Sequence, residues 1–450
     1  MSYVTIRKEN GANIDSYCKD WSNGQPIVFG HGWRRKLMKP VLATVVAVAG
    51  CAAAAASVAS AGAEIRFATF NASLNRSDAG LLVTHLSNPD VDDVFRRQIH
   101  NVAEVIQREQ PDVLLINEFD FDPAAADLFR TNFLEVSQNG AEPIYFSYAF
   151  IAPSNTGIPS GKDLDNNGVV DTTPGDGTYA NDSFGFGFFP GQFGMVVYSK
   201  YPIDYDAVRT FQFFLWKDMP GNLIPTPFYS PDEVDILRLS SKSHWDVPIL
   251  IDRKTVHFLV SHPTPPVFDG PEDRNGRRNF DEIRFWADYI SPGQSGYIYD
   301  DSGVYGGLKP GELFVIAGDQ NSDPLDGDSI PRAAQQLFDN PLVNSRIWPQ
   351  SAGAVEASAL QRGANLTHRS DPRFDTADFA DVPGPGNLHA DYVLPRKNLQ
   401  IVDSAVFWPV LADPLSRLTG VFDPAWLPVG GFPTSDQRSV WMDVNLPGVQ

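Results

Sequence analysis

Polar side chains that could bind a metal ion or a phosphate follow apolar runs at several places along this chain. Each stands where a short apolar stretch turns abruptly into acidic or amide-bearing sequence, as Glu118 does after Leu115 and Ile116. The set comprises Asn71, Glu118, His262, Asp319, Asn321, Asp391 and Asp436. A single residue of this kind is commonly a turn residue or a cap, but seven in one chain indicate a shared site. Carboxylates, amides and one histidine, without cysteine, are ligands typical of Mg²⁺ or Mn²⁺ and not of zinc or copper.

The apolar runs that carry these residues are typical of buried strands. Strands are expected at 65–71, 113–118, 194–199, 247–251, 256–262, 313–318, 391–394, 401–407 and 439–444. Apolar residues from Val91 to Ile106 recur at helical spacing, and Pro111 ends that helix; a second helix is expected at 278–290. Numerous strands with fewer, interspersed helices predict an α/β fold in which two packed sheets are covered by outer helices.

Six short motifs occur in an order that resembles the endonuclease/exonuclease/phosphatase superfamily. They are Thr-Phe-Asn (69–71), Asn-Glu (117–118), Ser-His-Pro (261–263), Gly-Asp-x-Asn (318–321), Asp-Tyr-Val (391–393) and Ser-Asp-x-Arg (435–438). Each motif is weakly specific alone, whereas six in the right order are strongly specific. The resemblance spans roughly residues 65–445. It implies a four-layered α/β sandwich, made of two packed mixed sheets with outer helices, over a domain at 64–450.

The resemblance also implies an activity, the hydrolysis of phosphomonoesters or phosphodiesters by metal-activated water. The implied metal ligands, for Mg²⁺ or Mn²⁺, are Asn71, Glu118 and Asp436. His262 would hydrogen-bond the scissile phosphate, Asp319 would orient or deprotonate the attacking water, and Asn321 would hold a phosphate oxygen. Such a set suits phosphoryl transfer, which needs a positioned nucleophile and neutralised phosphate oxygens.

One position departs from the superfamily pattern. Its terminal motif is Ser-Asp-His, and Gln437 stands where that His belongs; in the superfamily, Asp391 would orient this His. A glutamine can donate a hydrogen bond to a phosphate, but it cannot accept a proton at neutral pH. Three interpretations stay open: a catalytically impaired protein that acts in binding or as a scaffold, Gln437 as a donor only, or partial substitution by His389. The last rests on strand alternation, which would place His389 and Asp391 on one face.

Arg274, Arg277 and Arg278 form the dense basic run of an otherwise acidic region, just before the second predicted helix. Guanidinium groups and free backbone N–H groups at a helix start could bind an anionic substrate. A solvated helix start, balanced by nearby acidic residues, is an equally good interpretation.

The loop-like stretch 151–190 contains a calcium-loop pattern. Asp163, Asp165, Asn167 and Asp171 stand at positions one, three, five and nine, and Gly168 at position six. Oxygen ligands at this spacing suit Ca²⁺. Pro174 replaces the bidentate Glu expected at position twelve, so a solvated acidic loop is the alternative.

The first 63 residues have a different character. Basic residues precede an Ala/Val-rich run that ends in Ala61-Gly62-Ala63, which predicts a signal peptide at 38–63 and a secreted or periplasmic protein. Val48-Ala49-Gly50-Cys51 resembles a lipobox, so a lipid anchor on Cys51 is the alternative, and a membrane span is another. Residues 1–37 begin like an α/β-hydrolase, yet no Gly-x-Ser-x-Gly elbow follows; they are interpreted as a vestigial or non-native leader.

The charge is strongly acidic. The chain has 35 Lys+Arg and 55 Asp+Glu, a net charge of −20. Residues 1–63 hold seven basic and three acidic residues, so the remainder has 28 against 52, or −24. A groove-binding nuclease normally shows a basic excess. A small phosphate ester is therefore a better substrate prediction than duplex DNA, and no stable protein partner is evident, so a monomer is expected.

Overall fold

The computed structural model describes residues 63–381, 384–446 and Gly448, together with the backbone of three strands near the N-terminus. The chain comprises two units, Met1–Val58 and Ala59–Gln450. In the first, β1 (Tyr3–Glu9), β2 (Ala12–Lys19) and β3 (Ile27–Phe29) form an antiparallel sheet. The predicted signal peptide, up to Gly62, and the alternative anchor Cys51 lie outside the described residues. Among the residues that are described, no helix has both the length and the hydropathy needed to cross a membrane.

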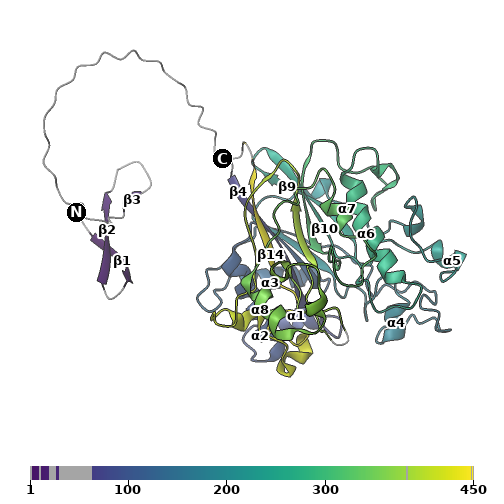
Figure 1. Cartoon of the computed structure of the whole chain (residues 1–450), viewed down its shortest axis with the longest axis horizontal. Coiled ribbons are helices and arrows are strands. Elements are labelled where there is room, and N and C mark those ends of the chain that lie inside the picture. The colour runs from purple at the N-terminus through teal and green to yellow at the C-terminus, as the bar shows by residue number, and fades with distance from the viewer. Residues whose placement is uncertain are drawn as a thin grey trace, which may run out of the picture. The chain divides into compact units, whose positions relative to one another are not determined.

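Two mixed sheets form the centre of the second unit (Figure 1). The six-stranded sheet has the order β13 (Gln400–Val406), β14 (Val440–Leu446), β4 (Ala63–Leu74), β5 (Val113–Phe119), β7 (Met195–Ser199), β6 (Tyr148–Phe150). The five-stranded sheet has the order β12 (Asp391–Pro395), β11 (Leu313–Asp319), β10 (Lys254–Ser261), β9 (His244–Ile251), β8 (Arg209–Thr210). Each sheet contains one parallel pair, β4 with β5 and β10 with β11, among antiparallel neighbours.

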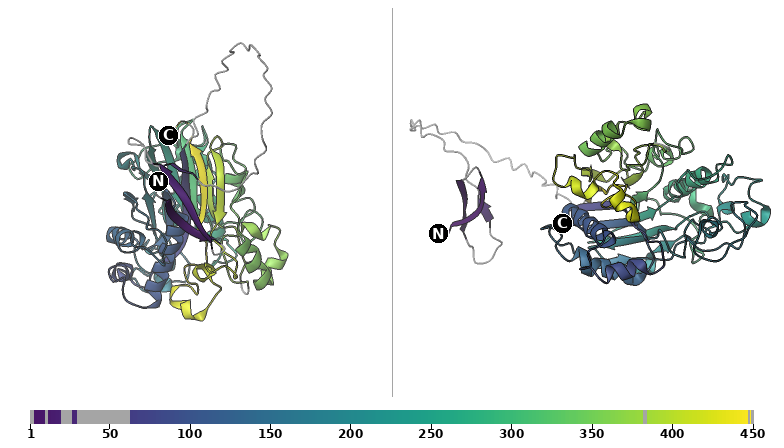
Figure 2. Two further views of the ribbon diagram at one scale, coloured as in Figure 1. Left: turned by 90° about the vertical axis from the view of Figure 1, so that its left-hand side faces the viewer. Right: turned by 90° about the horizontal axis from the view of Figure 1, so that it is seen from below.

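Helices cover the outer faces of both sheets (Figure 2). The longest are α2 (Val94–Glu109), packed on the six-stranded sheet, and α6 (Arg274–Ile290), packed on the five-stranded sheet. The shorter helices are α1 (Leu81–Leu86), α3 (Pro123–Phe129), α4 (Gly177–Asn181), α5 (Pro231–Val234), α7 (Gln335–Phe338), α8 (Ala352–Gln361) and α9 (Ser416–Thr419). A third apolar cluster, with Phe67 and Phe258 in contact at a ring distance of 5.6 Å, fills the space between the sheets. The predicted four-layered α/β sandwich is confirmed.

The element boundaries follow from local sequence. Asp93 caps α2 by accepting a hydrogen bond from the Arg96 N–H at 2.9 Å, so the helix begins after Val91, which is 48% exposed. Gln110 ends α2 in the left-handed conformation, just before Pro111. The second helix begins at Arg274, four residues earlier than predicted, so the basic run lies within its first two turns.

Candidate active site

The strand ends of both sheets meet at one rim. The parallel pair β4 and β5 sets Asn71 opposite Asn117, and the antiparallel pair β11 and β12 sets Asp319 opposite Asp391. The two sheets are tied together here, because the Asp319 backbone N–H donates to Asn117 Oδ1 at 3.2 Å. The topology thus brings together residues that are 248 positions apart, Asn71 and Asp319, whose side chains lie 3.1 Å apart.

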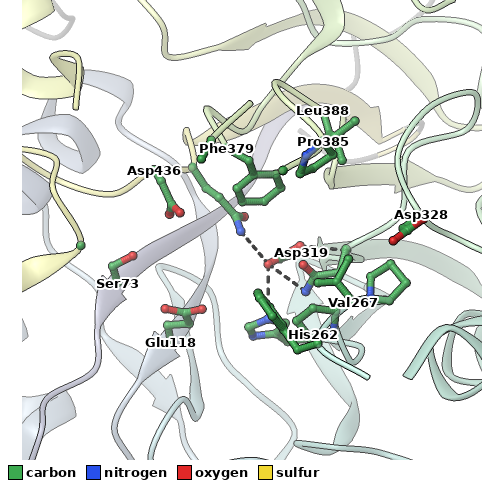
Figure 3. A pocket seen from close by; sticks show the side chains of 18 of the residues that line it. Ser73, Glu118, His262, Val267, Asp319, Asp328, Phe379, Pro385, Leu388 and Asp436 are labelled. Carbon is green, nitrogen blue, oxygen red and sulfur yellow. Dashed lines mark hydrogen bonds and ion pairs between the residues drawn. The ribbon is translucent and has the colours of Figure 1, made fainter. Parts of the chain in front are cut away.

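Asp319 is the centre of the polar network at this rim (Figure 3). Its Oδ2 accepts hydrogen bonds from Gln437 Nε2 at 2.9 Å, Asn71 Nδ2 at 3.1 Å and Asn321 Nδ2 at 3.3 Å. His262 Nε2 lies 3.3 Å from the same oxygen. Burial raises the pKa of Asp319, whereas the donated hydrogen bonds from Gln437 and Asn71 lower it. These donors hold the carboxylate in one orientation.

His262 is held as a neutral imidazole. It is 3% exposed, and burial, with a smaller effect of the nearby Lys242 charge, lowers its pKa well below the usual value. Because Nε2 faces the Asp319 carboxylate, Nε2 carries the proton and Nδ1 is left as an acceptor. Nδ1 is buried and has no hydrogen-bond partner among the described residues.

Glu118 and Asp436 form the acidic side of the site, with Ser73 between their elements (Figure 3). Burial, and then the charge of Asp436, raises the pKa of Glu118 to about 7; Asn71 partly offsets this by hydrogen bonding. Burial raises the pKa of Asp436 to about 6. Glu118 has a left-handed backbone, φ 58°, which is costly for a residue other than glycine. A strained carboxylate beside a second one is typical of a functional site.

A divalent cation fits this set of donors. Two carboxylates that repel each other and an adjacent amide, Glu118, Asp436 and Asn71, would gain from a shared positive charge. The residues present are hard oxygen donors, as Mg²⁺ and Mn²⁺ require. Among the described residues, three carboxylates come within 4.8 Å of one another only at Asp163, Asp165 and Asp182. Among the described residues, the carboxylates of the rim therefore do not form such a three-carboxylate cluster.

Glu118 and Asp436 line a cavity of about 760 Å³, whereas Asn71 lies behind its lining. Its polar floor comprises Ser73, Glu118, His262, Asp319, Asn321, Asp436 and Gln437. Six of these seven were predicted from sequence; Ser73 was missed, although it lies two residues beyond Asn71 and its hydroxyl lies 2.9 Å from that of Ser435.

The profile of the Endonuclease/Exonuclease/phosphatase family matches residues 68–436, most of the chain. The chain belongs to this family. Its strand-end motifs and its sandwich fold are those that the family resemblance implied.

Solved structures with a similar fold share few identical residues with this chain. An endonuclease/exonuclease/phosphatase from Beutenbergia cavernae is 17% identical, with 86% of this chain and 72% of that chain covered and a TM-score of 0.45. Sphingomyelinase C from Streptomyces griseocarneus is 15% identical, with 85% and 100% covered and a TM-score of 0.41. Beta toxin from Staphylococcus aureus, solved with bound magnesium ions, is 13% identical, with 85% and 99% covered and a TM-score of 0.41. No curated protein matches the chain.

The position of the family's terminal histidine is occupied by an amide that bonds to Asp319. Gln437 is 4% exposed, and its Oε1 has no partner among the described residues. Asp391 bonds to Thr376 Oγ1 at 2.8 Å and not to Gln437, and its Oδ1 is likewise without a partner there. Burial and the Asp319 charge raise the Asp391 pKa well above its usual value. Asp391 does not line the cavity; it lies behind the rim.

His389 does not share a face with Asp391, so that expectation was wrong. Strand β12 begins only at Asp391, and strand alternation does not extend to residue 389. The His389 ring packs instead against Trp348 and Tyr392, at ring distances of 5.2 and 4.6 Å. Burial lowers its pKa to about 3. His389 lies in an aromatic cluster and does not line the cavity, so it does not replace the missing histidine.

The predicted basic residues are mostly engaged in structural contacts. The Arg278 guanidinium donates to the carbonyl oxygens of Leu239, Phe184 and Arg238. Arg274 pairs with Glu272, and Arg277 donates to the Glu272 carbonyl at 3.0 Å. Arg274 and Arg278 line a second cavity, of about 480 Å³, and Arg277 lines neither.

Sequence reasoning missed Lys242, which lines this second cavity together with Glu118 and His262. The available signal was weak. Lys242 is a single cation in a serine-rich turn just before β9, with no acidic residue beside it in sequence.

Two of the four predicted calcium ligands lie in a carboxylate cluster. Asp163 and Asp165 approach Asp182 within 4.8 Å. The side chains of Asn167 and Asp171 instead accept hydrogen bonds from the backbone N–H two residues further on. Asp182 lies beyond the span of the loop motif, so the pattern could not reveal it. Calcium binding here stays a prediction.

Proposed function

We propose that this protein is a divalent-metal-dependent phosphoesterase, which hydrolyses phosphate esters by attack of water on phosphorus. The observation that carries the proposal is the arrangement at the rim, where Glu118, Asp436, Asp319 and His262 line one cavity. Behind them, the Asn71 amide donates to Asp319 at 3.1 Å. When bound, Mg²⁺ or Mn²⁺ would neutralise phosphate oxygens and lower the pKa of water.

The chain's own residues would position the reacting groups. Asp319 would orient the attacking water and accept its proton, since its carboxylate is fixed by N–H donors from Gln437 and Asn71. Asn321 would hold a phosphate oxygen. For His262 to donate to the phosphate, its Nε2 proton must be shared between the substrate and Asp319, which lies 3.3 Å away. Such fixed donors stabilise developing charge without reorganising.

The direct test is the release of p-nitrophenol from p-nitrophenyl phosphate and bis-p-nitrophenyl phosphate, with Mg²⁺, Mn²⁺ or Ca²⁺ and with EDTA. We expect metal-dependent turnover that Glu118→Gln and Asp319→Asn each reduce by about a hundredfold or more. Asp206→Asn, at an exposed position outside both cavities, is the matched control. Turnover that persists in EDTA, or that survives both substitutions, would refute the proposal.

A second candidate function is a binding or scaffold role without catalysis. The observation that favours it is Gln437, which cannot accept a proton and leaves the Asp391 carboxylate without its usual partner. In that case phosphate esters bind in a metal-dependent way, measurable by calorimetry, and no p-nitrophenol appears with any metal.

Export and assembly state are also proposals. The predicted signal peptide supports a secreted or periplasmic monomer that acts on small phosphate esters, with a Cys51 lipid anchor as the alternative. N-terminal sequencing of the exported protein distinguishes a start at Glu64 from an acylated Cys51, and light scattering gives the assembly state.

A further inference from the structure

Two cavities meet at the site. The first, of about 760 Å³, and the second, of about 480 Å³, share Glu118 and His262 at their base. They also share the segment Pro265–Phe268, of which Pro265, Val267 and Phe268 line both. Phe268 is 89% exposed and lies at the outer edge. The adjacent prolines 265 and 266 restrict the backbone of this segment. It separates the two cavities and leaves them connected where the reacting phosphate would lie.

The first cavity has apolar walls beyond its polar floor. Phe379, Pro385 and Leu388 lie together on one side of it (Figure 3), and Val429 adds to the wall. Its charged lining residues are all acidic, and no Lys or Arg lines it among the described residues. A chain of phosphates would meet these carboxylates with no cation to balance it. An uncharged, apolar group is the occupant that such walls favour.

The second cavity is also largely apolar. Its own walls include Leu164, Phe186, Phe193, Tyr229 and Leu237, all five from segments outside the sheets. Its volume suits a single ring or a short chain, smaller than the occupant that the first cavity admits.

One cation without a partner among the described residues lines the second cavity, together with Glu118 and His262, which line both cavities. Lys242 is 7% exposed, and its ammonium forms no hydrogen bond or ion pair with another described residue. The nearby Glu282 does not pair with it, because the Glu282 oxygens accept the N–H groups of Ser241 and Thr264, each at 2.6 Å. A buried ammonium without a partner is costly. A phosphate oxygen at the junction would satisfy it.

We infer that the substrate is a phosphodiester with one anionic phosphate between two apolar groups, one in each cavity, and that Lys242 binds a non-bridging oxygen of that phosphate. The inference rests on the proposed function and names its substrate class. A monoester would leave one cavity empty, and a polyphosphate would place charge against the acidic lining of the first cavity. In the second cavity, Arg274 and Arg278 are already engaged, by Glu272 and by backbone carbonyl groups. A diester carries a single negative charge and two arms, which match one free cation and two apolar cavities.

The test uses three esters with the same p-nitrophenol leaving group: p-nitrophenyl phosphate, methyl p-nitrophenyl phosphate and phenyl p-nitrophenyl phosphate. With Mg²⁺ or Mn²⁺, we expect kcat/KM to be about tenfold or more higher for the phenyl than for the methyl diester, since a ring buries more apolar area than a methyl group. We expect the monoester to be the poorest of the three substrates.

Variants in each cavity show which cavity binds which group of the diester. Phe186→Ala changes only the second cavity and Phe379→Ala only the first. One of them should abolish the preference for the phenyl diester, and the other should lower kcat/KM for both diesters alike. Tyr145→Ala removes an aromatic ring that is 63% exposed and lines neither cavity, and should change neither value. Lys242→Met should lower kcat/KM for all three esters and leave their order of preference unchanged.

Failure of the inference and failure of the proposed function give different results. Metal-dependent turnover with equal rates for both diesters, or with the monoester preferred, overturns the inference and leaves the phosphoesterase proposal intact. Absence of turnover with every metal overturns the enzyme proposal. The inference is then decided by calorimetry: diphenyl phosphate should bind more tightly than dimethyl phosphate, and Phe186→Ala or Phe379→Ala should reduce that difference. Equal binding of both phosphates would overturn it.

Discussion

Gln437→His restores the histidine that the family carries at this position, and its effect follows from two opposing contributions. A general acid or base is worth about 10²–10⁴ in rate. The substitution also removes the hydrogen bond from Gln437 Nε2 to Asp319 Oδ2, 2.9 Å long and buried. A hydrogen bond to a charged group contributes about 1.5–3 kcal/mol, or roughly 10- to 150-fold. The gain exceeds the loss at the centre of both ranges, so we expect kcat/KM to rise about tenfold or more.

The unpartnered Asp391 Oδ1 makes this gain possible, because it is available to orient a ring nitrogen at position 437. The assay is initial-rate hydrolysis of bis-p-nitrophenyl phosphate with Mg²⁺ or Mn²⁺, alongside melting temperatures to confirm folding. Gln437→Leu is the matched control: it loses the same hydrogen bond without supplying a base, and should fall about 10- to 150-fold below the parent. If Gln437→His and Gln437→Leu have equal rates, residue 437 does not contact the reacting phosphate and the reasoning fails.

Three further predictions concern stability and metal binding. Burial raises the pKa of Glu109 to about 7 from 4.5, so the folded state holds a proton that the unfolded state has released. The contribution of Glu109 to the free energy of unfolding therefore falls as pH rises from about 4.5 to 7, by at most about 3 kcal/mol. In chemical denaturation, Glu109→Gln should flatten this fall, whereas Glu142→Gln, at an exposed position, should show the same pH dependence as the parent. Glu118→Gln should raise the melting temperature in EDTA, because it removes the repulsion between the Glu118 and Asp436 carboxylates, and should abolish the stabilisation that Mg²⁺ or Mn²⁺ gives the parent. Ca²⁺ should raise the melting temperature of Glu118→Gln but not of a double variant that also carries Asp163→Asn; no shift in either would contradict calcium binding at the loop.

The sequence predicted the longer strands, most of which are buried on both faces, and missed the short edge strands β6 and β8. β5 and β11, for example, are near-continuous apolar runs, and their predicted bounds agree with the structure to within a residue. The family motifs predicted the residues of the rim because strand ends of a given topology always meet at the same edge. Pairing partners were less predictable. That Gln437 bonds to Asp319 and not to Asp391 depends on side-chain geometry over 118 positions of chain.

Segments outside the regular elements were the least predictable. The aromatic environment of His389 depends on Trp348, which lies in a loop, and on Phe338, the last residue of the four-residue helix α7. The engagement of Arg278 by three carbonyl groups depends on where loops pass over the start of α6. Local charge could suggest an anion site there, but only the fold shows that the guanidinium is already satisfied.

This contrast separates the chemistry of the site from its selectivity. The polar groups for phosphate hydrolysis, such as Glu118 and Asp319, stand on strands, where the sheets fix their positions. The apolar walls of both cavities, such as Phe186 and Phe379, come from loops, which vary more readily than the elements they connect. The acidic surface fits the same division: it disfavours polyanions in general, while one buried ammonium, Lys242, remains for a single phosphate. Changes in the loops should therefore alter which diester is preferred and leave the metal requirement unchanged.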